Sequence, residues 1–103
     1  MNRIVAILRP YRLAQTLEAL ASCSGIVQMT SQEVRGYGMQ KDHLESSSGD
    51  DVGMDFLPKI RLEVLVEAEY TEEAMDAVIR GGRTGRIGDG KIFLIQEEDG
   101  RPV

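Results

Sequence analysis

Several residue types are scarce in this 103-residue sequence, and each shortage excludes a class of function. There is no tryptophan and only one cysteine, Cys23, which excludes an internal disulfide and any cysteine cluster for metal or redox chemistry. The one histidine, His43, leaves no pair of imidazoles for a metal centre. No apolar run approaches the roughly 18 residues that cross a bilayer, and the N-terminus lacks the apolar core of a signal peptide. We therefore expect a cytoplasmic protein.

Basic residues are outnumbered as well. The chain has 12 Lys and Arg against 17 Asp and Glu, which gives a net charge of −5. Non-specific nucleic-acid binding needs a basic surface, so we expect no nucleic-acid partner. The net charge does not exclude local basic pockets. The length and a hydrophobic content of 42% fit one domain, residues 1–103, with a core of modest size.

The hydrophobic pattern predicts two similar βαβ halves. Apolar residues recur at strand or helix spacing along most of the chain. The predicted strands cover residues 3–9, 26–35, 60–66 and 91–95, one predicted helix covers residues 11–22, and the other runs from an N-cap at Thr71 to Gly81-Gly82. This order predicts an α+β, ferredoxin-like βαββαβ fold, with an antiparallel sheet and both helices on one face. A chain this short cannot cover the other face, so we expect oligomerisation. Cys23 is expected to be buried near the first helix end.

The most informative segment is residues 83–93, which carry three glycines and Lys91 between a predicted helix and a predicted strand. Glycine backbone N–H groups can cradle an anion and a lysine adds positive charge, so the segment predicts a phosphate site. The spacing from Gly85 to Lys91 resembles a Walker A pattern. However, Ile92 stands where the Mg²⁺-binding hydroxyl should be, and the helix precedes the strand. A glycine-rich turn after a helix cap at Gly81-Gly82 is the plainer alternative.

The segment from Gly36 to about Leu57 has no hydrophobic period and contains three consecutive serines at residues 46–48. Structureless loops beyond about 12–15 residues are uncommon in compact domains, and they are usually functional or disordered. We expect a protruding loop that reads a ligand or contacts a partner. A disordered insertion without function is the alternative.

The glycine run and the long loop together resemble the PII signal-transduction family over residues 3–94. The run RTGRIGDGKIF, which contains residues 83–91, resembles the family's nucleotide-binding B-loop almost residue for residue. Residues 36–58 resemble its flexible T-loop, with GYGMQK at the start and DFLPK at the end. Residues 7–10 resemble the family's first strand and turn, and residues 97–103 form a polar tail.

The resemblance implies a homotrimer with three clefts between subunits, each of which binds an adenine nucleotide: ADP or ATP, with AMP as a further candidate. Carried over by position, the nucleotide-binding residues are Ile7, Thr30, Gly36, Gly38, Glu63, Arg83, Thr84, Gly88, Asp89, Gly90 and Lys91. Gln40 and Lys59 match the positions that bind 2-oxoglutarate together with Mg²⁺ and ATP. There the glutamine supplies an oxygen to Mg²⁺, and the lysine pairs with a carboxylate of the keto acid.

Three departures from the family pattern change these expectations. Val52 occupies the position of the uridylylated tyrosine, so that modification is absent. Met39 replaces an arginine that helps to hold phosphates, and the family's C-terminal arginine-bearing segment has no counterpart after Phe93. Fewer cations weaken binding of the most charged nucleotide, so we expect ADP or AMP to compete better against ATP than in typical members. Because 2-oxoglutarate binding needs Mg²⁺-ATP, we expect the response to 2-oxoglutarate to be weaker as well.

The leading hypothesis is a regulatory sensor of nitrogen or carbon metabolism, not an enzyme. Nucleotide occupancy would set the T-loop conformation, Gln40 would couple the two, and the loop would dock on a target transporter or enzyme. One alternative is a specialised PII-like protein that responds to ADP or AMP and bicarbonate, or that serves metal transport.

Two further classes stay open. A weak nucleotide hydrolase would use the same topology, as acylphosphatase-like folds do, but no Ser/His/Asp arrangement accompanies the glycine run. A metal-binding trimer would use His43, Met39, Met54 and Asp51. Without cysteine ligands or paired histidines, that signal is weak.

Overall fold

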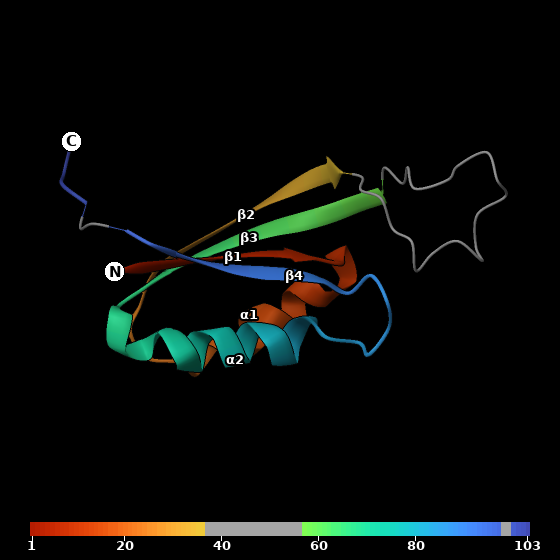
Figure 1. Ribbon diagram of the computed structural model, residues 1–103, viewed down its shortest axis with the longest axis horizontal. Coiled ribbons are helices and arrows are strands. Elements are labelled where there is room, and N and C mark those ends of the chain that lie inside the picture. Colours follow the sequence, from red (N-terminus) through yellow and green to blue (C-terminus); the bar gives the residue numbers. More distant parts are fainter. Residues whose placement is uncertain (37–56, 98–99) are drawn as a thin grey trace, which may run out of the picture.

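The computed structural model describes residues 1–36, 57–97 and 100–103, which form four strands and two helices (Figure 1). The strands are β1 (Asn2–Leu8), β2 (Ile26–Gly36), β3 (Leu57–Val66) and β4 (Gly90–Gln96), and the helices are α1 (Leu13–Ala21) and α2 (Thr71–Gly82). A short 3-10 turn leads into each helix, at Pro10–Arg12 and at Ala68–Tyr70. None of the helices in the described ranges has the length and apolar character needed to cross a membrane.

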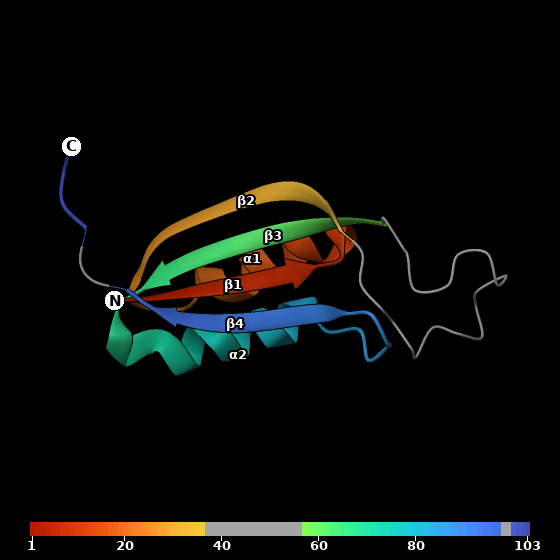
Figure 2. The ribbon, with the colours of Figure 1, turned by 45° about the horizontal axis from the view of Figure 1, so that its top comes forward.

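One antiparallel sheet contains these strands in the order β2–β3–β1–β4. Central β1 pairs with both β3 and β4, so Ala6 lies opposite Leu62 on one side and Ile92 on the other. Both helices lie on the same face of the sheet (Figures 1 and 2). The predicted ferredoxin-like βαββαβ fold is therefore confirmed.

The hydrophobic core lies between the sheet and the two helices. Every second residue of β1 and β3 faces the helices, as the two-residue period of a strand requires. The buried members of this core are Ile4, Ala6, Leu8, Leu20, Leu62, Val64, Val66, Ala74, Ala77 and Val78. Burial of each large aliphatic side chain contributes about 1.5–3 kcal/mol, so this layer holds both helices on the sheet.

The two helices pack closely where Gly81 of α2 faces Thr16 of α1. A Cβ built on Gly81 would lie 2.4 Å from the Cα of Thr16, so no larger residue fits without separating the backbones. The Thr16 hydroxyl donates to the Arg12 carbonyl at 2.8 Å, and Arg12 Nε donates to the Gly81 carbonyl at 2.8 Å. Arg12 thus satisfies a carbonyl at the C-terminal end of α2. This contact fixes the point from which the glycine run departs.

The largest difference from the predicted strand boundaries is at β3. The other strands differ by one residue at one or both ends, and α1 covers Leu13–Ala21 rather than residues 11–22, because Pro10–Arg12 forms the 3-10 turn. β3 begins at Leu57 rather than at residue 60, so Leu57 and Pro58, which were assigned to the loop 36–58, lie in a strand. They pair with Gly36 and Arg35 of β2, beyond the last residue pair between β1 and β3. Proline is tolerated there because the ribbon has only two strands. Hydrophobic periodicity could not reveal this extension, since Leu57 and Pro58 are both exposed.

Two smaller predictions were also wrong. Thr71 is the first residue of α2 and not its N-cap, because the preceding 3-10 turn continues directly into the helix and places Tyr70 at the cap position. The Thr71 hydroxyl instead donates to the Ala68 carbonyl at 2.9 Å and accepts from Asn2 Nδ2 at 2.8 Å, which ties α2 to β1. Cys23 is only partly buried, although this burial still raises the pKa of its thiol.

The sheet face away from the helices carries apolar and charged side chains. Val5 and its register partner Phe93 lie on this face, and Phe93 is 51% exposed. Arg3, two residues along β1 from Val5, forms ion pairs with Glu63 and Glu97. Its hydrogen bonds are the main reason why the pKa values of both carboxyls lie below their ordinary range.

Candidate functional site

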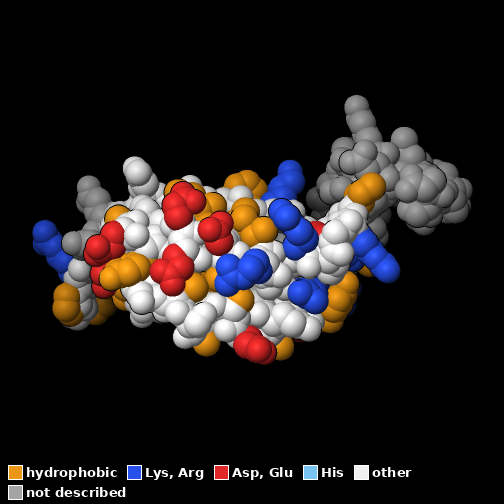
Figure 3. Space-filling view, turned by 90° about the horizontal axis from the view of Figure 1, so that it is seen from below, with side chains coloured by type: hydrophobic (Ala, Val, Ile, Leu, Met, Phe, Trp, Pro, Cys, Tyr) orange, Lys and Arg blue, Asp and Glu red, His pale blue; other side chains and the backbone are white. Residues whose placement is uncertain are grey.

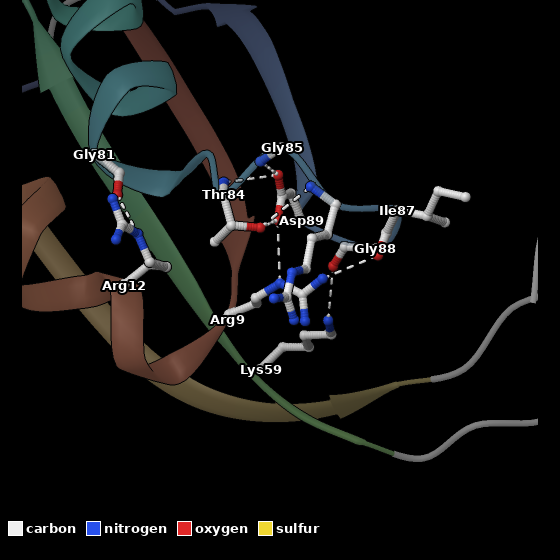
Figure 4. Close-up of polar contacts among 10 residues, drawn as sticks. Arg9, Arg12, Lys59, Gly81, Thr84, Gly85, Ile87, Gly88 and Asp89 are labelled. Atoms are coloured by element: carbon white, nitrogen blue, oxygen red, sulfur yellow. Dashed lines mark hydrogen bonds and ion pairs between the residues drawn. The ribbon is translucent and has the colours of Figure 1, made fainter. Parts of the chain in front are cut away.

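The glycine run forms a loop between the end of α2 and the start of β4 (Figure 4). Within it, the Asp89 carboxylate accepts hydrogen bonds from the backbone N–H of Thr84 at 2.8 Å, from the N–H of Gly85 at 2.9 Å, and from the Thr84 hydroxyl. These donors favour the charged carboxylate. The pKa of Asp89 lies well below its usual range, first because of the Thr84 hydroxyl and then because of the backbone N–H groups and Arg9.

Two basic side chains from other strands reach the loop. Arg9, directly after β1, places Nε 3.1 Å from Asp89 Oδ1, and its Nη2 donates to the Ile87 carbonyl at 2.9 Å. Lys59 of β3 donates from Nζ to the Gly88 carbonyl at 3.2 Å. In Figure 4 both side chains point toward the loop from the β1 and β3 side. The loop is therefore fixed by side chains from two strands as well as by its own carboxylate.

Glycine is required at several loop positions by backbone conformation. Gly85, Gly88 and Gly90 have φ values of +87°, +90° and +134°, which L side chains rarely adopt. Gly90 also passes against β1, where a Cβ built on it would lie 1.8 Å from the Ile7 carbonyl oxygen. The glycines that predicted an anion site thus also allow the loop to join the sheet.

The surface around the loop is positively charged. Arg83, Arg86 and Lys91 are exposed. Figure 3 shows that Lys and Arg side chains gather toward one end of the helical face, and that Asp and Glu side chains gather toward the other. The acidic group includes Glu72 and Glu73 in the first turn of α2. A local basic region in a chain of net charge −5 favours anion binding at this end.

A cavity of about 180 Å³ adjoins the loop between β1, α2 and β4. Its lining combines core side chains with charged residues of the loop. Among the lining residues are Leu8, Val78, Ile92, Arg83, Asp89 and Lys91. Apolar surface beside a few polar groups is typical of small-ligand sites.

Most of the predicted nucleotide-binding residues lie together at this loop. Ile7 is the register partner of Lys91, which brings the end of β1 to the start of β4. The predicted residues that the structure places here are Ile7, Arg83, Thr84, Gly88, Asp89, Gly90 and Lys91. Lys59, predicted to bind an effector, joins them through its bond to Gly88.

Thr30 and Glu63 lie elsewhere in the same chain. Thr30 is on β2, at the opposite edge of the sheet from β4, and pairs with Glu63 on β3. The Glu63 carboxylate is engaged by Arg3 and Arg61. A single copy of the chain therefore does not place Thr30 beside the glycine loop. A site that uses both edges of the sheet needs a second copy.

Several predicted residues cannot be placed. Gly36 ends β2, whereas Gly38 and Gln40 lie outside the described residues. The same holds for Val52 and for the alternative metal set of His43, Met39, Met54 and Asp51. In the part of the chain that the structure describes, no three His, Cys, Asp or Glu residues are grouped so as to hold a metal ion.

Arg9 is the loop contact that the sequence analysis missed. In the sequence it is a basic residue directly before Pro10, at the end of a predicted strand and within the segment 7–10 that resembles the family's first strand and turn. The sheet order explains the contact: Leu8 pairs with Gly90, which places the end of β1, and so Arg9, beside the loop. Sequence periodicity alone does not give strand order.

The chain is similar over nearly its whole length to proteins of one family. The family model described as Nitrogen regulatory protein P-II matches residues 1–100. Nitrogen regulatory protein P-II 1 of Escherichia coli (strain K12) is 45% identical over 94 residues, which cover 91% of this chain and 83% of that protein. Nitrogen regulatory protein P-II of Haemophilus influenzae is 44% identical over 98 residues, which cover 95% of this chain and 87% of that protein.

Proposed function

Because the chain belongs to the nitrogen regulatory protein P-II family, we propose that its glycine loop binds the phosphates of an adenine nucleotide and that nucleotide occupancy regulates a target protein. The observation that carries this proposal is the loop itself. Gly88 and Gly90 have positive φ, the exposed Lys91 directly follows, and Arg83 and Arg86 extend the basic surface. Glycine-lined loops with a nearby lysine are suited to hold phosphate oxygens.

We propose that the complete site forms between copies of the chain in a homotrimer. Support comes from the sheet: the glycine loop starts β4 at one edge, whereas Thr30 lies on β2 at the other edge. An assembly that places the β2 edge of one copy against the β4 edge of the next would unite both sets. It would also cover apolar side chains such as Phe93, which is 51% exposed in one copy.

ADP or ATP is the proposed ligand, with AMP as a competitor. With ATP, Gln40 would supply an oxygen to Mg²⁺, and Lys59 would pair with the carboxylate of 2-oxoglutarate. In the free chain Lys59 donates to the Gly88 carbonyl of the phosphate loop. An acidic effector that binds Lys59 would therefore act on the nucleotide site directly. In this proposal the protein is a cytoplasmic regulator of a transporter or enzyme and does not itself catalyse a reaction.

Calorimetric titration of the purified protein with AMP, ADP and ATP tests this function. Each titration is repeated with Mg²⁺ plus 2-oxoglutarate and with bicarbonate, which separates a response to 2-oxoglutarate from one to a small anion. Lys91→Gln removes a loop cation, and Arg80→Gln is the control because Arg80 is exposed in the last turn of α2. We expect Lys91→Gln to weaken binding about tenfold and Arg80→Gln to change it little. Absence of binding by all three nucleotides would refute the proposal.

Nucleotide hydrolysis is measured in the same samples. Robust turnover that disappears in Lys91→Gln would favour the hydrolase alternative over a regulator. Light scattering supplies the assembly state, and a particle of three times the 11.4 kDa chain mass is expected.

A further inference from the structure

The glycine loop uses several of its backbone N–H groups internally. Those of Thr84 and Gly85 donate to the Asp89 carboxylate, that of Arg86 donates to the Thr84 hydroxyl at 3.3 Å, and that of Arg83 donates to the Ile79 carbonyl at 3.0 Å. The first half of the loop therefore presents no spare backbone donor to a ligand.

The tip of the loop differs from its first half. Among the hydrogen bonds of the described residues, none uses the backbone N–H of Ile87 or of Gly88. Their carbonyls, by contrast, are both held, that of Ile87 by Arg9 and that of Gly88 by Lys59. With the carbonyls fixed by cations from the sheet, the peptide groups at the tip are restrained while two successive N–H groups stay available for an anion.

Arg9 and Asp89 form the centre of this restraint. Their side chains are 24% and 21% exposed, and Arg9 bridges the Asp89 carboxylate and the Ile87 carbonyl with two different nitrogens. Asp89 in turn holds the backbone of Thr84 and Gly85. One arginine–carboxylate pair therefore links the end of β1, the first half of the loop and its tip.

We infer that Arg9 and Asp89 are positioning residues of the phosphate site, which shape the loop so that the N–H groups of Ile87 and Gly88 face a phosphate, and that neither side chain is itself a phosphate ligand. This inference rests on the proposed nucleotide function. A carboxylate repels phosphate, and this one already accepts from three groups of Thr84 and Gly85 as well as from Arg9. Its contribution is preorganisation of the loop, which reduces the entropy cost of binding.

The Asp89→Asn variant tests the inference by the sign of its effect. If Asp89 acted only through charge, removal of its negative charge would tighten ADP binding. In the positioning role the variant weakens binding, because the asparagine amide nitrogen cannot accept from Arg9 or from the Thr84 hydroxyl. We expect ADP affinity measured by calorimetry to fall about tenfold or more.

Arg9 is tested with two variants and a matched control. Arg9→Gln and Arg9→Lys are both expected to weaken ADP binding, because the compact ammonium of a lysine does not reproduce the two separate guanidinium nitrogens that contact Asp89 and the Ile87 carbonyl. A lysine variant that binds ADP like the wild type would show that only the charge matters, and so would overturn the role of Arg9. Arg80→Gln is the control, since Arg80 is an exposed arginine in the last turn of α2.

Amide hydrogen exchange of the unliganded protein gives a readout that does not depend on nucleotide. The N–H groups of Thr84 and Gly85 should exchange faster in Asp89→Ala, which removes both carboxylate oxygens, than in the wild type, whereas those of the β1–β3 ladder should not. Unchanged protection of both groups would overturn the inference. If the wild type binds no nucleotide, the proposed function is wrong. If it binds ADP and Asp89→Asn binds equally well or better, the function stands and the positioning role is overturned.

Discussion

The backbone of Gly90 passes so close to Ile7 that a Cβ built on Gly90 would lie 1.8 Å from the Ile7 carbonyl oxygen. Gly90 has a φ of +134° and begins β4, where the glycine loop enters the sheet. The close approach involves backbone on both sides, so a rotamer change cannot relieve it. This single residue therefore couples the glycine loop to the central strand.

Gly90→Ala should destabilise the protein strongly. A positive φ in a residue with a Cβ costs about 1–3 kcal/mol, and the clash with Ile7 adds to it. Gly85→Ala is the matched control, because Gly85 has a φ of +87° but nothing within 4 Å of its added Cβ, and we expect it to cost about 1–2 kcal/mol. Urea unfolding measures both. Equal losses in the two variants would contradict the role assigned to the Gly90–Ile7 contact.

Gly81→Ala should also destabilise the fold, although alanine is normally the better helix former by about 1 kcal/mol. The added Cβ would lie 2.4 Å from the Thr16 Cα, and neither backbone can move without separating the helices. At Gly82 the added Cβ meets the end of the Leu8 side chain at 2.7 Å, which can rotate away. Gly81→Ala should therefore have a lower thermal unfolding midpoint than Gly82→Ala. The reverse order would show that the helices do not pack as described.

The free energy of unfolding should fall at acidic pH, because three hydrogen-bonded carboxylates become protonated. The folded-state pKa values of Asp89, Glu63 and Glu97 are lowered, chiefly by the Thr84 hydroxyl for Asp89 and by Arg3 for the other two. Such groups stabilise the folded state above their unfolded pKa of about 4, and this contribution is lost as the pH falls below it toward the lowered folded values. Urea midpoints should be steady from about pH 7 to 5 and drop below about pH 4. The drop should be smaller in Asp89→Asn; an identical profile would exclude Asp89 as a contributor.

Phe93→Asp should dissociate the proposed trimer. Phe93 is 51% exposed on the sheet face away from the helices, and a charge there cannot be buried in an interface without a partner. Tyr11→Asp is the control, because Tyr11 is 61% exposed in the 3-10 turn before α1. Light scattering should report monomers for Phe93→Asp and trimers for Tyr11→Asp. Trimers in both would place the interface elsewhere.

The elements were predictable because their signals are local. The apolar spacing along β1 and β3 reflects the core face directly, and Gly82 lies at the end of α2 where the sequence placed it. Local signals predicted the wrong boundary where contacts with a neighbouring element decided it. The 3-10 turn before α2 displaced Thr71 from the cap, and pairing with β2 extended β3 back to Leu57 without a buried face.

The glycine loop was found from composition, but its internal organisation was not. The resemblance predicts Asp89 as a residue of the nucleotide site, and this stays a prediction. Only the structure shows that its carboxylate accepts hydrogen bonds from Thr84 and Gly85 of its own loop. Arg9 lies in the segment that resembles the family's first strand and turn, but the sequence analysis gave it no role in the site. Its role depends on the pairing of β1 with β4, which brings together residues 80 positions apart in the chain.

The sequence by itself determined the order of the strands and helices along the chain, the position of the glycine loop and the family, because hydrophobic period, glycine content and motif spacing are properties of consecutive residues. The tertiary structure decided which residues complete and restrain the loop. It brought Arg9 and Lys59 to the loop and kept Thr30 at the opposite edge of the sheet. The reason is physical: strand order and register follow from burial of the common core between sheet and helices, and that burial involves the whole chain at once.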